Sequence, residues 1–128
     1  MPGETDLTAM LASLEVERRP GTFTFVTGEW PELAAAAHAT IDEAEGRTLV
    51  VPVHDAHSAG ATVAFEASWL TLTVHSALEA VGLTAAFSAA LGDAGISCNV
   101  LAGYHHDHLL VPADRADEAI EVLRRLSG

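Results

Sequence analysis

The order of strand and helix patterns in the second half of the chain restricts the fold more than any other feature. Apolar residues alternate along "WLTLTVH" (69–75), which predicts a strand with one buried face. An apolar helical stripe follows over 83–94 and is closed by Gly95, because glycine readily adopts the left-handed conformation that ends helices. The segments "ISCNVLAGY" and "HLLV" come next, and the short polar stretch between them predicts a tight antiparallel hairpin.

A last amphipathic helix completes this half. Pro112 ends the second hairpin strand, and Asp114 is placed to cap the helix that follows. Its apolar stripe consists of Ala116, Ala119, Ile120, Leu123 and Leu126. The resulting order, β-α-β-β-α, is that of a ferredoxin-like sheet with helices on one face, and it lacks only the last strand of that fold.

The first half of the chain predicts a shorter copy of the same unit. A helical stripe runs from Leu7 to Leu14, and the predicted strands cover 22–27, 38–42 and 47–53. A loop is expected before the second of these strands, a helical turn over 55–59, and an extended segment over 61–66. The predicted fold class is α+β: two ferredoxin-like (βαββαβ) modules with antiparallel sheets and helices on one face, occupying residues 1–66 and 67–128.

Composition narrows the classes of partner. The 128 residues contain no lysine, and six arginines face eighteen acids, for a formal net charge of −12. Such a surface repels polyanions, so neither nucleic acid nor an anionic membrane is expected to bind. No apolar run approaches the roughly 20 residues of a membrane-spanning helix, and the N-terminus carries no secretion signal. The single cysteine, Cys98, forms no internal disulfide and favours the reducing cytoplasm.

The stretch "GYHHDHLLV" (103–111) holds three histidines and an aspartate, which are typical of a metal or acid–base site. His106 and His108 share one face of a strand, but a zinc site needs three or four protein ligands. His54 and His57 would supply the rest if the fold brought them close. The alternative is a hairpin tip in which Asp107 bonds to the turn backbone, and the chemistry of turns favours it. A histidine-rich metal-binding protein therefore stays open as a minor alternative, and no metal is predicted.

Catalytic motifs are missing from the sequence. It contains no serine-nucleophile elbow, no phosphate-binding loop, no dinucleotide fingerprint and no HExxH zinc motif. The carboxylates lie on amphipathic or loop segments, where solvation accounts for them. We therefore expect neither an enzyme nor a bound cofactor.

The stretch from 69 to 123 resembles an ACT domain, a small ligand-binding module attached to many enzymes of amino-acid biosynthesis. The resemblance rests on the loop before Gly82, the turn "AGIS" after the helix, Asn99 and Val100 on the next strand, and the polar hairpin leading to "HLLVP". It is strongest for the aspartokinase-like subgroup and for stand-alone bacterial proteins with two such modules. The first module would then be a divergent one.

The resemblance implies a non-catalytic regulatory protein that binds a small effector, an amino acid, at the interface of paired modules. It also implies a homodimer or higher homo-oligomer. The ligand-binding residues carried over from the family are His75, Ser76, Val81, Gly82, Leu83, Thr84 and Asn99. A glycine at a helix start lets backbone approach a ligand closely, although the same glycine also suits simple helix entry. The alternative is a structural or oligomerisation module whose ligand site has lapsed.

Overall fold

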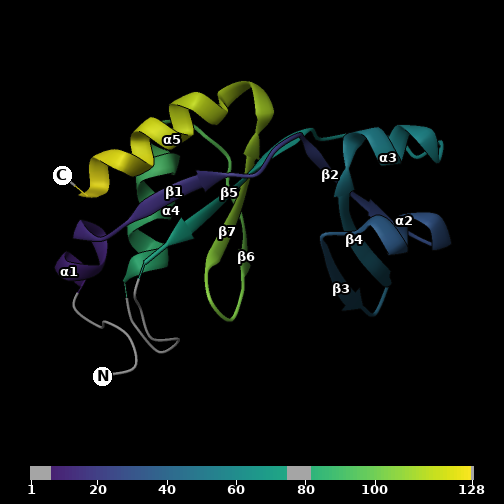
Figure 1. The fold of residues 1–128 in the computed structure, drawn as a ribbon, viewed down its shortest axis with the longest axis horizontal. Helices are drawn as coiled ribbons and strands as arrows, with labels where there is room; N and C mark the ends of the chain where they lie inside the picture. The colour runs from purple at the N-terminus through teal and green to yellow at the C-terminus, as the bar shows by residue number, and fades with distance from the viewer. Residues whose placement is uncertain (1–6, 75–81, 128) are drawn as a thin grey trace. The chain divides into compact units, whose positions relative to one another are not determined.

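The computed structural model of the chain describes residues 7–74 and 82–127, and these form two compact units (Figure 1). Unit 1 comprises residues 1–19 and 69–128, and unit 2 comprises residues 20–68. The chain thus leaves unit 1 after Arg19 and re-enters it at Trp69. Every helix among the described residues is too short or too polar to span a bilayer.

Unit 1 contains the predicted β-α-β-β-α order. Its elements are β5 (Ala67–Thr73), α4 (Leu83–Asp93), β6 (Asn99–Ala102), β7 (Asp107–Pro112), the 3-10 turn η1 (Ala113–Arg115), α5 (Ala116–Arg124) and the 3-10 turn η2 (Arg125–Ser127). Strands β6 and β7 form the predicted antiparallel hairpin, with Asn99 opposite Leu110 and Ala102 opposite Asp107. Strand β7 lies between β5 and β6, as in a ferredoxin-like sheet.

The fourth strand of unit 1 comes from the beginning of the chain. Helix α1 (Leu7–Ala12) leads into β1 (Glu15–Arg18), which pairs antiparallel with β5. The strand order β1-β5-β7-β6 is therefore the complete ferredoxin-like order, with its last strand supplied from upstream. Sequence reasoning missed β1, because "EVER" has one apolar residue, Val16, and so shows no alternation to detect.

Helices α1, α4 and α5 build one core with the sheet of unit 1, and Figure 1 shows α4 and α5 on the same side of the strands. The core includes Met10, Leu70, Leu72, Phe87, Leu91, Leu109, Val111, Ala119 and Leu123. The expectation that β5 buries a single face was wrong. Trp69 and Thr71, on the opposite face from Leu70 and Leu72, are only 3% and 9% exposed.

The predicted cap of the last helix was also wrong. Asp114 lies inside η1, and Arg115 takes the N-cap position of α5 with no side-chain cap bond among the described residues. The Arg115 guanidinium instead donates to the carbonyl oxygens of Ala94 (3.1 Å) and Gly95 (3.3 Å). Carbonyls at the end of α4 have no partner within the helix, so Arg115 ties α4 to the start of α5.

Unit 2 repeats the β-α-β-β-α order in a shorter form. Its elements are β2 (Phe23–Thr27), α2 (Pro31–Ala36), β3 (Ala39–Glu43), β4 (Gly46–Pro52) and α3 (Val53–Ser58). Strand β4 pairs antiparallel with both β2 and β3, so the order β3-β4-β2 matches β6-β7-β5 of unit 1. Helix α2 occupies a region where a loop was expected. At the position of a fourth strand, Ala67 pairs with Phe23.

One buried hydroxyl in unit 2 leads to a stability prediction. Thr24 lies on the same face of β2 as the core residue Val26, is fully buried, and its Oγ1 has no hydrogen-bond partner among the described residues. We expect Thr24→Val to raise the free energy of unfolding by about 1 kcal/mol, because an unsatisfied polar atom is removed at nearly constant shape. Urea denaturation measures the change.

The matched control lies on the same strand. The Thr27 hydroxyl is exposed and donates to the Arg47 carbonyl oxygen at 3.2 Å, so Thr27→Val removes a satisfied group. It should leave the stability unchanged or slightly lower. A loss of stability in Thr24→Val would show that its hydroxyl has a partner.

Candidate functional site

The predicted ligand loop of unit 1 is described only in part. His75, Ser76 and Val81 lie outside the described residues. Gly82 precedes α4 with φ +99°, a left-handed conformation, and a Cβ placed on it would lie 3.3 Å from Leu7 Cδ2.

The remaining predicted residues differ in what they offer a ligand. The Leu83 side chain is 5% exposed and belongs to the core, so only its backbone is available for binding. Thr84 is exposed next to it. Asn99 is exposed at the first position of β6, which follows the opposite end of α4. Since α4 has 11 residues and is about 16 Å long, the structure does not bring Asn99 to Gly82 within the unit.

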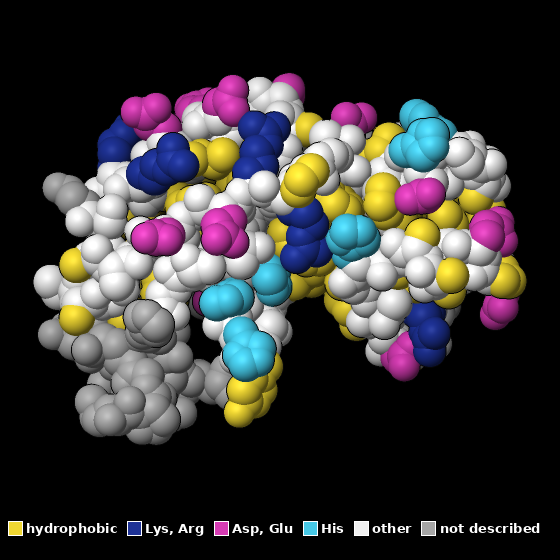
Figure 2. Space-filling model, viewed as in Figure 1, with side chains coloured by type: hydrophobic (Ala, Val, Ile, Leu, Met, Phe, Trp, Pro, Cys, Tyr) yellow, Lys and Arg dark blue, Asp and Glu magenta, His cyan; other side chains and the backbone are white. Residues whose placement is uncertain are grey.

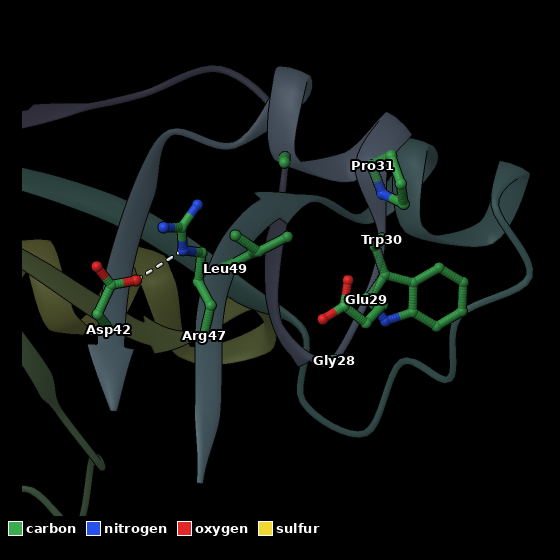
Figure 3. A pocket seen from close by; sticks show the side chains of 8 residues that line it. Gly28, Glu29, Trp30, Pro31, Asp42, Arg47 and Leu49 are labelled. Carbon is green, nitrogen blue, oxygen red and sulfur yellow. Dashed lines mark hydrogen bonds and ion pairs between the residues drawn. The ribbon is translucent and has the colours of Figure 1, made fainter. Parts of the chain in front are cut away.

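Unit 2 has a pocket at the corresponding place, between its first strand and its first helix (Figure 3). The pocket has a volume of about 360 Å³. It is lined by Gly28, Glu29, Trp30, Pro31, Ala34, Asp42, Arg47 and Leu49. Sequence reasoning did not find this pocket. The available signal was "TGEWP", a glycine, an acid and an aromatic residue between a strand and a proline.

The loop beneath the pocket is held in place by short-range contacts. Gly28 has φ +114°, which a residue with a side chain rarely adopts. The Trp30 indole Nε1 donates to the Thr27 carbonyl oxygen at 3.1 Å, and Pro31 suits the first position of α2, where no amide donor is needed. The Trp30 ring is thereby positioned as an apolar wall of the pocket.

Charged groups of both signs line the pocket. Arg47 Nε and Asp42 Oδ1 are 2.7 Å apart, and Glu29 lies on the loop beside Trp30. Seen from the side drawn in Figure 3, Leu49 lies between the Arg47–Asp42 pair and the Trp30 loop. The side chains of Arg47 and Asp42 are 54% and 78% exposed, so their ion pair adds little stability. Arg47 can therefore exchange Asp42 for the carboxylate of a ligand at small cost.

The backbone hydrogen bonds of the histidine-rich hairpin show which residues form its turn. Gly103 N donates to the His106 carbonyl oxygen at 2.9 Å, so the turn covers 103–106, and Asp107 lies in β7 opposite Ala102. The expected place of Asp107 in the turn was wrong. Figure 2 shows histidine side chains on the surface at the end of this hairpin. Within the described residues, no three His, Cys, Asp or Glu side chains gather as a metal ion requires.

Comparison with known families gives two matches. A family model described as "ACT domain" matches residues 2–68, and a second model with the same description matches residues 64–125. The chain belongs to the ACT-domain family. ACT domains are regulatory modules that bind small molecules, and the resemblance seen in 69–123 is confirmed. The two matches meet at 64–68, whereas the compact units divide at 19/20 and 68/69. The division into modules at 1–66 and 67–128 thus stays a prediction. It differs from the compact units in the assignment of α1 and β1, which belong to unit 1.

Solved structures of similar fold include a protein of unknown function from Vibrio cholerae, described as a possible transport protein. It is 41% identical with a TM-score of 0.85, and the match covers 95% of this chain and 96% of that one. The regulatory subunit of aspartate kinase from Thermus thermophilus is 12% identical with a TM-score of 0.63, covering 87% and 95%. Aspartate kinase from Clostridium acetobutylicum is 8% identical with a TM-score of 0.66, covering 90% of this chain and 34% of the kinase. The two kinase likenesses concern the fold alone. No curated protein sequence matches the chain.

Proposed function

We propose that the chain is a non-catalytic regulatory protein that binds an amino-acid effector through its ACT modules. The observation that carries the proposal is the unit 2 pocket, where one cation, two carboxylates and an aromatic ring surround about 360 Å³. Its place, after the first strand of a module, is the place at which the family resemblance puts the ligand.

The pocket chemistry complements a zwitterion. The planar guanidinium of Arg47 suits a carboxylate, with which it forms two parallel hydrogen bonds. Asp42, released from Arg47, and Glu29 are acceptors for the α-ammonium group. Trp30 and Leu49 offer apolar surface to the effector side chain, as small-molecule sites usually do.

The loop of unit 1 belongs to the same proposal. His75 to Thr84 would form a second effector site, with an asparagine supplied by a neighbouring module, because Asn99 lies beyond the far end of α4 in its own unit. Such a shared site requires association of modules, and we propose a homodimer or higher homo-oligomer. Effector binding would favour one arrangement of modules over others, which is what regulation requires. A cytoplasmic location remains the expectation from the single cysteine.

Thermal melts against the twenty amino acids test this function. We expect one or a few of them to raise Tm in a concentration-dependent manner, because a ligand at 100 times its Kd adds about 2.7 kcal/mol to the stability. Arg47→Gln should reduce the rise, since the effector carboxylate loses its partner in the unit 2 pocket. Arg124→Gln, on the exposed surface of α5, is the matched control and should keep it.

Other outcomes point elsewhere. A flat panel from a well-folded protein would contradict effector binding and favour an oligomerisation module. A Tm that falls with chelator and recovers with zinc would favour the metal-binding alternative. A full response in Arg47→Gln would show that the effector binds outside the unit 2 pocket, and effector binding itself would still stand.

A further inference from the structure

A partly buried cluster in unit 1 joins the two segments that lead to and from unit 2. We call it the Trp69 cluster; it consists of Arg19, Trp69, Thr71 and His108. Arg19 is the last residue of unit 1 before the chain enters unit 2, and Trp69 is the first after it returns. The Arg19 amide donates to the Trp69 carbonyl oxygen at 2.9 Å, so both crossing points lie side by side.

Three side-chain contacts complete the cluster. The Arg19 guanidinium carbon lies 4.0 Å from the centre of the Trp69 ring, a cation–π contact. The Trp69 Nε1 donates to His108 Nδ1 at 3.1 Å, and the rings meet edge to face with centroids 5.5 Å apart. Thr71 Oγ1 lies 3.0 Å from the same nitrogen of His108.

This geometry determines the protonation state of His108. An indole N–H is a donor and never an acceptor, so His108 Nδ1 accepts and carries no proton, and the ring is neutral with its hydrogen on Nε2. Protonation of Nδ1 would set two N–H groups against each other. It would also place a second positive charge beside a ring that already holds the Arg19 guanidinium.

The charged groups around His108 act in the same direction, with one exception. Burial lowers the pKa of His108, and the positive charges of Arg19 and His106 lower it further, whereas Asp107 opposes them. Strand β5 contributes two neutral side chains to the cluster, Trp69 and Thr71. On the neighbouring strand β1, Glu17 lies opposite Thr71.

We propose that protonation of His108 releases the Trp69 indole and loosens the pairing of the Arg19 and Trp69 segments. The hydrogen bonding of the two segments that lead to and from unit 2 then depends on pH. The reasoning uses the contacts of unit 1 alone and does not depend on effector binding. The direction follows from linkage. The folded chain binds this proton less tightly than the unfolded chain, so the contribution of His108 to stability is complete above about pH 6.5 and is lost as the pH falls through the lowered pKa.

Nuclear magnetic resonance of the full-length protein between pH 4.5 and 8 tests the proposal. The chain has two tryptophans, so Trp30→Phe assigns the Trp69 indole signal. We expect that signal to shift with a single midpoint below pH 6.5. The Nε2–H form of His108 should appear in long-range ¹H–¹⁵N spectra above the midpoint. The Arg19 amide should lose its protection against hydrogen exchange below the midpoint, after correction for the intrinsic rate.

Two asparagine variants separate His108 from other titrating groups. In His108→Asn the amide oxygen can take the place of Nδ1 as acceptor, yet it does not titrate, so the indole signal should be independent of pH. His105→Asn alters the exposed turn and should titrate as the unmodified protein does. The proposal is overturned by an indole signal that stays constant, by one that titrates unchanged in His108→Asn, or by Arg19 protection that is equal on both sides of the midpoint.

Discussion

A chain that lacks residues 1–19 is expected to lose the fold of unit 1, although it retains the whole stretch that resembles an ACT domain. The truncation removes β1 and leaves the edge of β5 from Leu70 to Thr73 without its partner. It also removes Met10, which is fully buried in the core of unit 1. Loss of such a core side chain alone costs about 2–5 kcal/mol, which is comparable to the total stability of many domains. Far-ultraviolet circular dichroism and the dispersion of amide signals measure the loss.

A rearranged chain provides the control. Residues 69–128, followed by a flexible linker of about six residues and then residues 7–19, place β1 after α5, as in an uninterrupted ferredoxin-like module. The linker needs little length, because α1 contacts η2 at the C-terminal end of unit 1. We expect this chain to fold and to melt cooperatively. A truncated chain with native signals and an unchanged melt would show that β1 is dispensable.

Gly82→Val is expected to lower the free energy of unfolding by about 2–3 kcal/mol. The left-handed φ of +99° is strained for any side chain and worst for a β-branched one. The new Cβ would also lie 3.3 Å from Leu7 Cδ2, so the Leu7 side chain has to shift slightly. Urea denaturation measures the effect.

Gly92 in the same helix is the matched control. It has no positive φ, and a Cβ placed on it meets no atom of the described residues within 4 Å. Gly92→Ala should therefore stabilise the protein by about 0.5–1 kcal/mol, because alanine favours the helix. An unchanged stability in Gly82→Val would mean that the backbone at this position relaxes freely. The expected loss also makes Gly82 a poor probe of effector binding, for which Arg47 is the better choice.

Periodicity in the sequence was sufficient to predict most of the elements. Alternation in 69–75, the stripe over 83–94 and the two hairpin segments each appear as a strand, helix or hairpin of unit 1. The shorter elements of unit 2 were also found, except for α2. That helix has six residues and one buried side chain, Leu33, which is too little for a helical period to be visible.

The candidate site was predictable only as a location along the chain. The loop between the first strand and first helix of a module was expected to bind the ligand, and the pocket of unit 2 lies in such a loop. Its lining residues come also from β3 and β4, since Asp42 and Arg47 face each other across that hairpin. Which strands contribute to a pocket depends on how the strands pair, and a single sequence does not show the pairing.

Most local elements and the family could be inferred from the sequence alone, because the apolar period of a segment indicates which face of that segment is buried. Only the tertiary structure decided that β1 completes the sheet of unit 1, and that His108 meets Trp69 across β5 and β7. These contacts join residues far apart in the chain, and their stability comes from hydrogen bonds and burial that exist only once both segments are in place. A polar strand such as "EVER" carries no period of its own, so its role depends on the partner that the fold supplies.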